Sequence, residues 1–148
     1  MKNYKYLKIA LYILGILIIA LGINVVLRSR LGAGAWDAVA KNFSELAVIS
    51  IGTASFIVNV SVLAVVGLYR RQLKYISILI PIVGIALAVD FWDIIVFKEL
   101  YISAIWLQLI FYILGATILT FGLAVMVIST YPAMVYEELT TMGMKVFK

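Results

Sequence analysis

The chain has 148 residues, of which 66% are hydrophobic and 13% charged, and its mean hydropathy is +1.16. Because soluble domains are only about half apolar, this composition indicates an integral membrane protein. The absence of cysteine and histidine excludes disulfides, thiolate nucleophiles, the usual zinc sites and imidazole acid–base chemistry, so we expect no enzyme activity, metal or cofactor. The net charge of +5 comes from Lys and Arg clustered at the ends of apolar runs, which indicates a lipid bilayer as the partner and not nucleic acid.

Four apolar runs have the length of membrane spans. A helix needs roughly 20 apolar residues to cross a hydrocarbon core about 30 Å thick. The four runs are residues 9–27, 51–68, 75–97 and 102–128. They predict an all-α fold, a polytopic membrane helical bundle with four transmembrane helices.

Two further segments are patterned as short interfacial helices. Residues 35–47 place apolar side chains on one face, while Asp37, Lys41 and Glu45 on the other face are spaced for i, i+4 charge pairing. Residues 133–146, after the fourth span, follow a proline suited to a first helical turn and also carry an apolar face. We expect the helix at 35–47 to lie at or dip into the membrane interface, and the segment at 133–146 to be its amphipathic counterpart.

An internal repeat organises the chain. Residues 12–37 recur one hundred positions later, at 112–137: Tyr-Ile-Leu-Gly opens both copies, and an aromatic residue followed by an acidic one closes both. This repeat divides the chain into a first unit, 1–100, and an incomplete second unit, 101–148. Because one unit holds three spans, the second enters the membrane upside down, as in inverted-repeat transporters. We expect further C-terminal helices or a homo-oligomer partner to complete it.

Four glycines recur in register within this repeat. Gly15 and Gly22 in the first span correspond to Gly115 and Gly122 in the fourth, and each pair is seven residues apart on one helix face. Small residues at such spacing let helix backbones approach closely in lipid. We therefore expect these glycines to pack the first and fourth helices together across a pseudo-twofold axis.

Basic residues predict the orientation. With the N-terminus inside, eight of the twelve Lys and Arg residues lie on the inner side and four on the outer side, which favours a cytoplasmic location for both termini in a bacterial plasma membrane. The inner group is Lys2, Lys5, Lys8, Arg70, Arg71, Lys74, Lys145 and Lys148, and the outer group is Arg28, Arg30, Lys41 and Lys98.

Two carboxylates in the third span are candidate site residues. Asp90 and Asp93 lie on one helix face at i, i+3. A charged side chain at the centre of a span costs about 3 kcal/mol, so we expect Asp90, the deeper one, to pair with Arg28 or Arg30 at the outer end of the first span, and Asp93 to reach the outer interface. Asp90 could serve a structural ion pair or a substrate or ion site, and the residues leave both readings open.

Two buried amides complete the candidate site. Asn24 and Asn59 are the deep polar residues of the first and second spans. Interhelical hydrogen bonds from such side chains contribute about 0.6 kcal/mol on average, which supports an architectural role. We nonetheless include both in a tentative substrate- or ion-binding set with the two arginines and the two aspartates.

At four segments the chain resembles the YczE/YyaS/YitT group of bacterial membrane proteins. These are Arg-Ser-Arg-Leu-Gly after the first span, Gly-Thr-Ala-Ser-Phe-Ile-Val-Asn-Val entering the second, Asp-Phe-Trp ending the third and a Pro-led segment after the fourth; they occupy residues 28–32, 52–60, 90–92 and 132–139. The resemblance covers nearly the whole chain and implies the membrane architecture. It also implies additional helices, since members of the group are longer.

Transport is the leading functional hypothesis. Polar residues buried in an inverted-repeat bundle indicate a transporter-like protein that binds or moves an unidentified small solute or ion. The rival hypothesis is a non-transporting membrane scaffold or assembly factor whose polar groups only hold helices together. A small dual-topology exporter or channel is a third reading, which the eight-to-four bias in basic residues disfavours.

Overall fold

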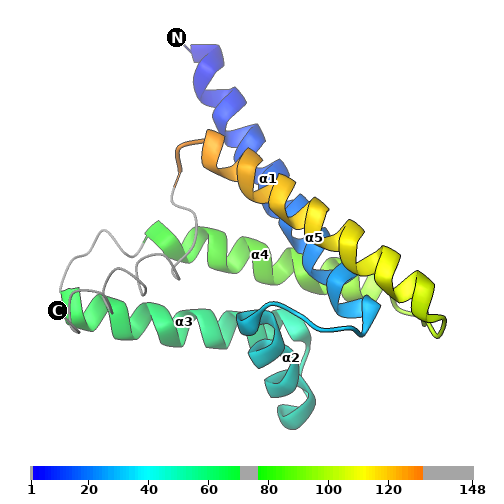
Figure 1. Ribbon diagram of the computed structural model, residues 1–148. Helices are drawn as coiled ribbons and strands as arrows, with labels where there is room; N and C mark the ends of the chain where they lie inside the picture. The colour runs from blue at the N-terminus through cyan, green and yellow to red at the C-terminus, as the bar shows by residue number, and fades with distance from the viewer. Residues whose placement is uncertain (1, 71–76, 132–148) are drawn as a thin grey trace, which may run out of the picture.

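The computed structural model describes residues 2–70 and 77–131, and within these ranges every regular element is a helix (Figure 1). The predicted segment 133–146 lies outside the described residues. The elements are α1 (Lys2–Ser29), α2 (Ala35–Ala47), α3 (Ile51–Arg70), α4 (Leu79–Phe91), the π-helical turn η2 (Trp92–Val96) and α5 (Ile105–Ile128).

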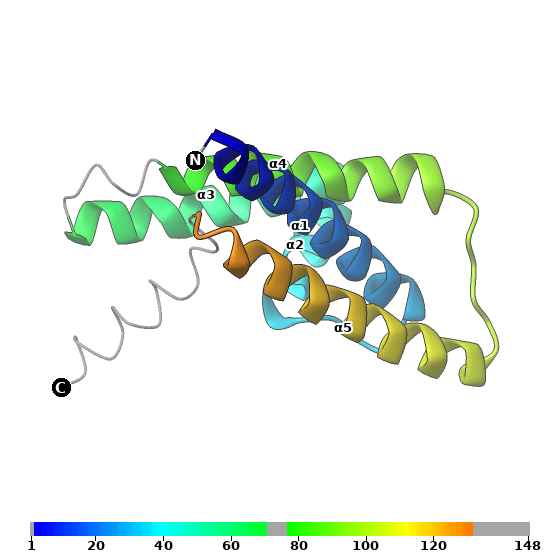
Figure 2. The same ribbon diagram turned by 90° about the horizontal axis from the view of Figure 1, so that it is seen from above.

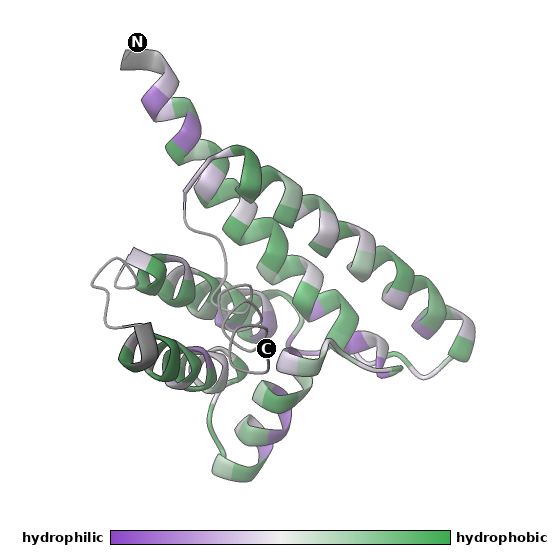
Figure 3. Ribbon diagram, turned by 60° about the vertical axis from the view of Figure 1, so that its left-hand side comes forward, coloured by the Kyte–Doolittle hydropathy of each residue, from purple (hydrophilic) through white to green (hydrophobic). Residues whose placement is uncertain are grey.

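Within the described residues, four helices are long and apolar enough to cross a membrane, as the sequence predicts. They cover Tyr4–Ser29, Ile51–Leu68, Leu79–Val96 and Ile105–Ile128. The third candidate span, Leu79–Val96, consists of α4 continued by η2. Figure 3 shows hydrophobic residues along these helices, with hydrophilic ones gathered near the start of α1 and along α2. The protein is therefore a membrane-embedded, all-helical protein, and α2 has the bounds that its amphipathic pattern predicts.

The α1 and α5 helices lie side by side and antiparallel (Figures 1 and 2). Gly22 lies against α5: a Cβ atom there would be 2.6 Å from the backbone nitrogen of Leu119. Gly122 lies against α1 in the same way, because its Cβ would be 2.7 Å from the nitrogen of Ile19. Both backbones approach closely only because neither glycine has a side chain.

The other two glycines of the repeat make a second pair of close approaches. A Cβ at Gly15 would lie 3.0 Å from the nitrogen of Met126, and one at Gly115 would lie 2.7 Å from the nitrogen of Val26. The contact of Gly15 with Met126 corresponds to that of Gly115 with Val26, each residue number being shifted by one hundred. The contact of Gly22 with Leu119 corresponds in the same way to that of Gly122 with Ile19. The α1–α5 contacts are therefore reciprocal, as in an interface between two symmetric subunits.

The turns that end α1 and α5 also match. The Ser29 hydroxyl donates to the Val26 carbonyl at 2.6 Å, and the Ser129 hydroxyl donates to the Met126 carbonyl at 2.6 Å. The next residue adopts a left-handed conformation in both turns, with φ of 61° at Arg30 and 64° at Thr130. The turns at residues 29–30 and 129–130, one hundred positions apart, thus have the same local structure, although Arg30 and Thr130 differ in side chain.

The remaining helices form a second layer against α1. The α4 helix packs on α1 and on α3, and α2 packs on α3. The main core lies where α1, α4 and α5 meet, around the fully buried Ile19, Ala20 and Met126 together with Val89. Apolar side chains such as Leu87 and Trp106 stay exposed on the outer surfaces of α4 and α5, as expected of surfaces that face lipid.

Candidate functional site

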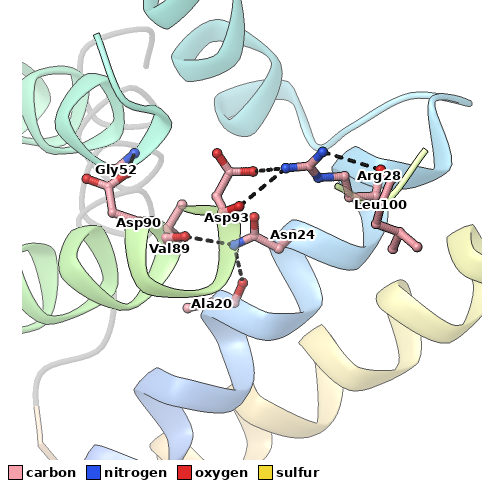
Figure 4. A network of polar contacts seen from close by, with 8 residues as sticks. All are labelled: Ala20, Asn24, Arg28, Gly52, Val89, Asp90, Asp93 and Leu100. Carbon is pink, nitrogen blue, oxygen red and sulfur yellow. Dashed lines mark hydrogen bonds and ion pairs between the residues drawn. The ribbon is translucent and has the colours of Figure 1, made fainter. Parts of the chain in front are cut away.

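A chain of polar contacts joins α1 to α4 (Figure 4). The Asn24 side chain is fully buried, and its amide nitrogen donates to the carbonyls of Ala20, at 3.0 Å, and Val89, at 3.1 Å. None of the described residues donates a hydrogen bond to its side-chain oxygen. Asn24 is therefore an interhelical link that leaves one buried acceptor unsatisfied, at a typical cost of about 1–3 kcal/mol.

The carboxylate that pairs with Arg28 is Asp93, so the prediction that Asp90 would be its partner is wrong. The Arg28 guanidinium is 2.6 Å from the Asp93 carboxylate, and it also lies 3.4 Å from the carbonyl oxygens of Asp93 and Leu100. Asp93 belongs to η2, whose wider winding changes the direction of side chains relative to a regular α-helix. Helical spacing alone could not anticipate that change.

Asp90 instead caps the N-terminus of α3. Its carboxylate accepts a hydrogen bond from the backbone N–H of Gly52 at 2.7 Å and one from the Ser50 hydroxyl at 2.7 Å. A carboxylate at this end of a helix is favoured by the helix dipole. Gly52 permits the contact, because a Cβ there would overlap the Ala86 carbonyl oxygen and approach the Asp90 carboxylate.

Arg30 and Asn59 lie apart from this network. The Arg30 guanidinium is 4.9 Å from the centre of the Tyr101 ring, a cation–π distance. The Asn59 side chain donates to the Ser55 carbonyl of its own helix at 2.8 Å. The six residues selected from the sequence are thus divided. Asn24, Arg28 and Asp93 form the polar contacts of α1 with α4 and η2. Asp90 caps α3, Arg30 lies at a cation–π distance from a tyrosine ring, and Asn59 lines a cavity.

This cavity has a volume of about 190 Å³ and is bounded by all five α-helices. Its walls are mainly apolar, and the polar side chains on them include Asn59, Ser55 and Asp37, the latter being the one charged group among the described lining residues. The lining residues are Ile19, Ile23, Gly34, Ala35, Trp36, Asp37, Ser55, Asn59, Pro81, Ile82, Ile85, Leu119 and Leu123.

Sequence reasoning missed Asp37. Its spacing to Lys41 predicted a solvated ion pair on the polar face of α2, but the two side chains form no salt bridge in the structure. Asp37 lies instead in the first turn of α2, which begins after Gly34, and lines the cavity. Burial raises the pKa of Asp37 to about 6. A carboxylate directly after a Gly-rich reversal between two spans was the signal that could have identified it.

Replacing Asp37 by asparagine should stabilise the protein at pH 8 and not at pH 4. The folded protein holds the Asp37 proton more tightly than the unfolded chain, because burial raises its pKa from 3.8 to about 6. Stability is therefore lost as the pH rises through this window. We expect Asp37→Asn to add about 2 kcal/mol to the free energy of unfolding at pH 8. This is less than a pKa shift of about two units represents, because the carboxylate keeps some contact with water.

Thermal unfolding in detergent micelles at pH 4 and pH 8 measures this effect. Glu45→Gln is the matched control, since it removes an exposed carboxylate from the same helix. Equal stability of wild type and Asp37→Asn at both pH values would show that the Asp37 carboxylate is not desolvated.

Comparison with known proteins supports the family resemblance. Over 134 residues the chain is 24% identical to the uncharacterized protein YyaS of Bacillus subtilis strain 168, an alignment that covers 90% of this chain and 67% of that protein. No solved structure matches the chain. The model of a family of unknown function, DUF6198, matches residues 6–148. The chain therefore belongs to the DUF6198 family, and its likeness to YyaS agrees with the resemblance seen in the sequence.

Proposed function

We propose that the protein is a transporter-like membrane protein that binds and moves a small solute or ion through the cavity at Asp37. The cavity itself carries this proposal, because it lies among all five α-helices and combines apolar walls with one carboxylate and one amide. Binding sites for small molecules are typically mostly apolar pockets with a few polar groups that fix orientation. Such a site suits a proton or a small cation with an apolar body.

We infer that the α1–α5 pair is the centre of an inverted repeat, and the position of the cavity supports this inference. Ile19 and Leu119 line it at equivalent positions of the two copies, and so do Ile23 and Leu123. The cavity thus lies beside the reciprocal α1–α5 contacts. Transporters built from inverted repeats bind their substrates at the interface of the repeats and move one repeat against the other.

Proton exchange at Asp37 is the coupling that we propose. Because the pKa of Asp37 is raised to about 6, its carboxyl group can change charge within the physiological pH range. Asn59 lines the same cavity, and its side-chain oxygen is a hydrogen-bond acceptor for a donor bound there. A cation and a proton would then compete for the same carboxylate.

The proposed orientation places both termini in the cytoplasm of a bacterial cell, with the loop between η2 and α5 outside. Lys98 lies in this loop and is exposed. Because the chain has no cysteine, Lys98→Cys introduces a single thiol. A membrane-impermeant maleimide should label it in intact cells, and labelling only after the cells are lysed would reverse the orientation.

Flux through proteoliposomes tests the proposed function. Vesicles loaded with a pH-sensitive dye are exposed to small organic ammonium ions, and we expect the lumen to become more alkaline as cations enter in exchange for protons. Asp37→Asn should abolish the response while the protein stays folded, and Glu45→Gln should leave it unchanged. No response across the ammonium panel, together with a stable co-purifying protein, would favour a scaffold or assembly factor instead.

A further inference from the structure

A second cavity, of about 340 Å³, lies where α1 ends. Its charged lining consists of Arg28, Arg30 and Lys41 as cations and Asp93 as the one carboxylate among the described residues. The apolar stretch of α1 ends at Leu27, so these charges follow directly after the membrane-spanning part of the helix. The cavity is thus at the depth at which lipid headgroups meet water.

Two of the three cations have no anionic partner in the described structure. Asp93 is already paired with Arg28 at 2.6 Å. Arg30 and Lys41 form no salt bridge with any described carboxylate, although Glu45 lies beside both of them in an adjoining cavity. Glu45 is exposed to water and therefore neutralises them only weakly. The cavity at the end of α1 thus holds two cations in excess.

The charges and the aromatic ring around Arg30 favour the binding of an oxyanion. The centre of the Tyr101 ring lies 4.9 Å from the Cζ atom of the Arg30 guanidinium, a cation–π distance. The Arg30 guanidinium forms no salt bridge with a described carboxylate, and its planar N–H groups are of the kind that bind phosphate in a bidentate manner. Lys41 adds a second positive charge from α2 on the opposite side of the chain reversal.

We propose that Arg30 and Lys41 bind one phosphate-type anion in this cavity, contributed either by the headgroup of an anionic lipid or by a free solute. Arg30 provides the planar donor and Lys41 the second charge, while Arg28 remains held by Asp93. The site is separate from the Asp37 cavity, with which it shares no lining residue. One ligand would thus join the end of α1 to α2, beside the loop that precedes α5.

Native mass spectrometry of the full chain tests this site with two probes. The protein is first exchanged into micelles that contain phosphatidylglycerol or phosphatidylcholine, and the retained lipid is counted. Inorganic phosphate is then added, with chloride at matched ionic strength as the comparison. We expect phosphatidylglycerol to be retained in preference to phosphatidylcholine, and Arg30→Gln and Lys41→Gln each to weaken its binding about fivefold.

Three variants make the result decisive. Lys98→Gln removes one exposed charge from the neighbouring loop, outside the cavity, and should change binding less than twofold. Arg30→Lys keeps the charge but not the planar donor, and should retain more binding than Arg30→Gln. The double variant Arg30→Gln/Lys41→Gln should lose about 25-fold and keep the unfolding temperature of the wild type.

Competition with inorganic phosphate distinguishes the two sources of the anion, a lipid headgroup and a free solute. Retention of phosphatidylglycerol that phosphate does not displace identifies a lipid site, whereas displacement by phosphate beyond that by chloride identifies a site for a free anion. An equal loss of binding in Lys98→Gln and in the cavity variants would overturn the proposal, and so would unchanged binding in the double variant. Neither result bears on flux through the Asp37 cavity, which is measured separately.

Discussion

Gly22→Ala should destabilise the protein by about 3 kcal/mol, although alanine is the better helix former. The added Cβ would lie 2.6 Å from the nitrogen and 2.7 Å from the Cα of Leu119. Both are backbone atoms of the neighbouring helix, so they cannot turn aside as a flexible side chain could. The α1 and α5 helices would have to separate along their contact, with the loss of the packing that holds them together in lipid.

Two further glycine variants test this explanation. Gly122→Ala should cost a similar amount, because its Cβ would be 2.7 Å from the nitrogen of Ile19 in the reciprocal contact. Gly67→Ala is the matched control: it lies within the spanning helix α3, and a Cβ there would meet nothing within 4 Å. We expect this change to be neutral or to stabilise by up to about 1 kcal/mol.

Unfolding of the purified protein by denaturant in mixed micelles measures all three variants. A similar small gain in stability for all three would mean that α1 and α5 do not approach as closely as described. A loss at Gly22 without a loss at Gly122 would instead contradict the reciprocity of their contacts.

Arg28→Gln and Asp93→Asn should each destabilise the protein by about 2 kcal/mol, and the double variant should recover much of that loss. The two charges are 2.6 Å apart, and their side chains are 26% and 21% exposed. Removal of one charge leaves the other in a partly buried position without its partner. The cost is below the 3–5 kcal/mol known for fully buried pairs, because water still reaches both groups.

A second double variant distinguishes Asp93 from Asp90 as the partner of Arg28. Asp90 accepts hydrogen bonds from Ser50 and Gly52, whereas the salt bridge of Arg28 is with Asp93. The effects of Arg28→Gln and Asp90→Asn should therefore add, whereas those of Arg28→Gln and Asp93→Asn should not. Unfolding free energies of the single and double variants provide both cycles. Additive effects in the Asp93 cycle would show that this pair contributes nothing to stability.

Asp90 and Asp93 show which features of this protein a local sequence pattern predicts and which it does not. Hydropathy and helical periodicity are local properties, so the sequence by itself determined the four spans and the bounds of α2. The spacing of small residues likewise implied that helices approach closely at the glycines. The repeat spacing likewise pointed to α1 and α5 as a pair, and the structure places Gly22 and Gly122 between these helices.

Only the tertiary structure decided which polar groups meet. Asp93 reaches Arg28 because η2 changes the winding at the end of α4, and Asp90 reaches α3 because Gly52 lets the two helices approach. Asp37 lines a cavity because the chain reversal after α1 directs the first turn of α2 between the spans. Each of these outcomes depends on how one helix is rotated and placed against another, and this relation arises from contacts between residues far apart in the chain.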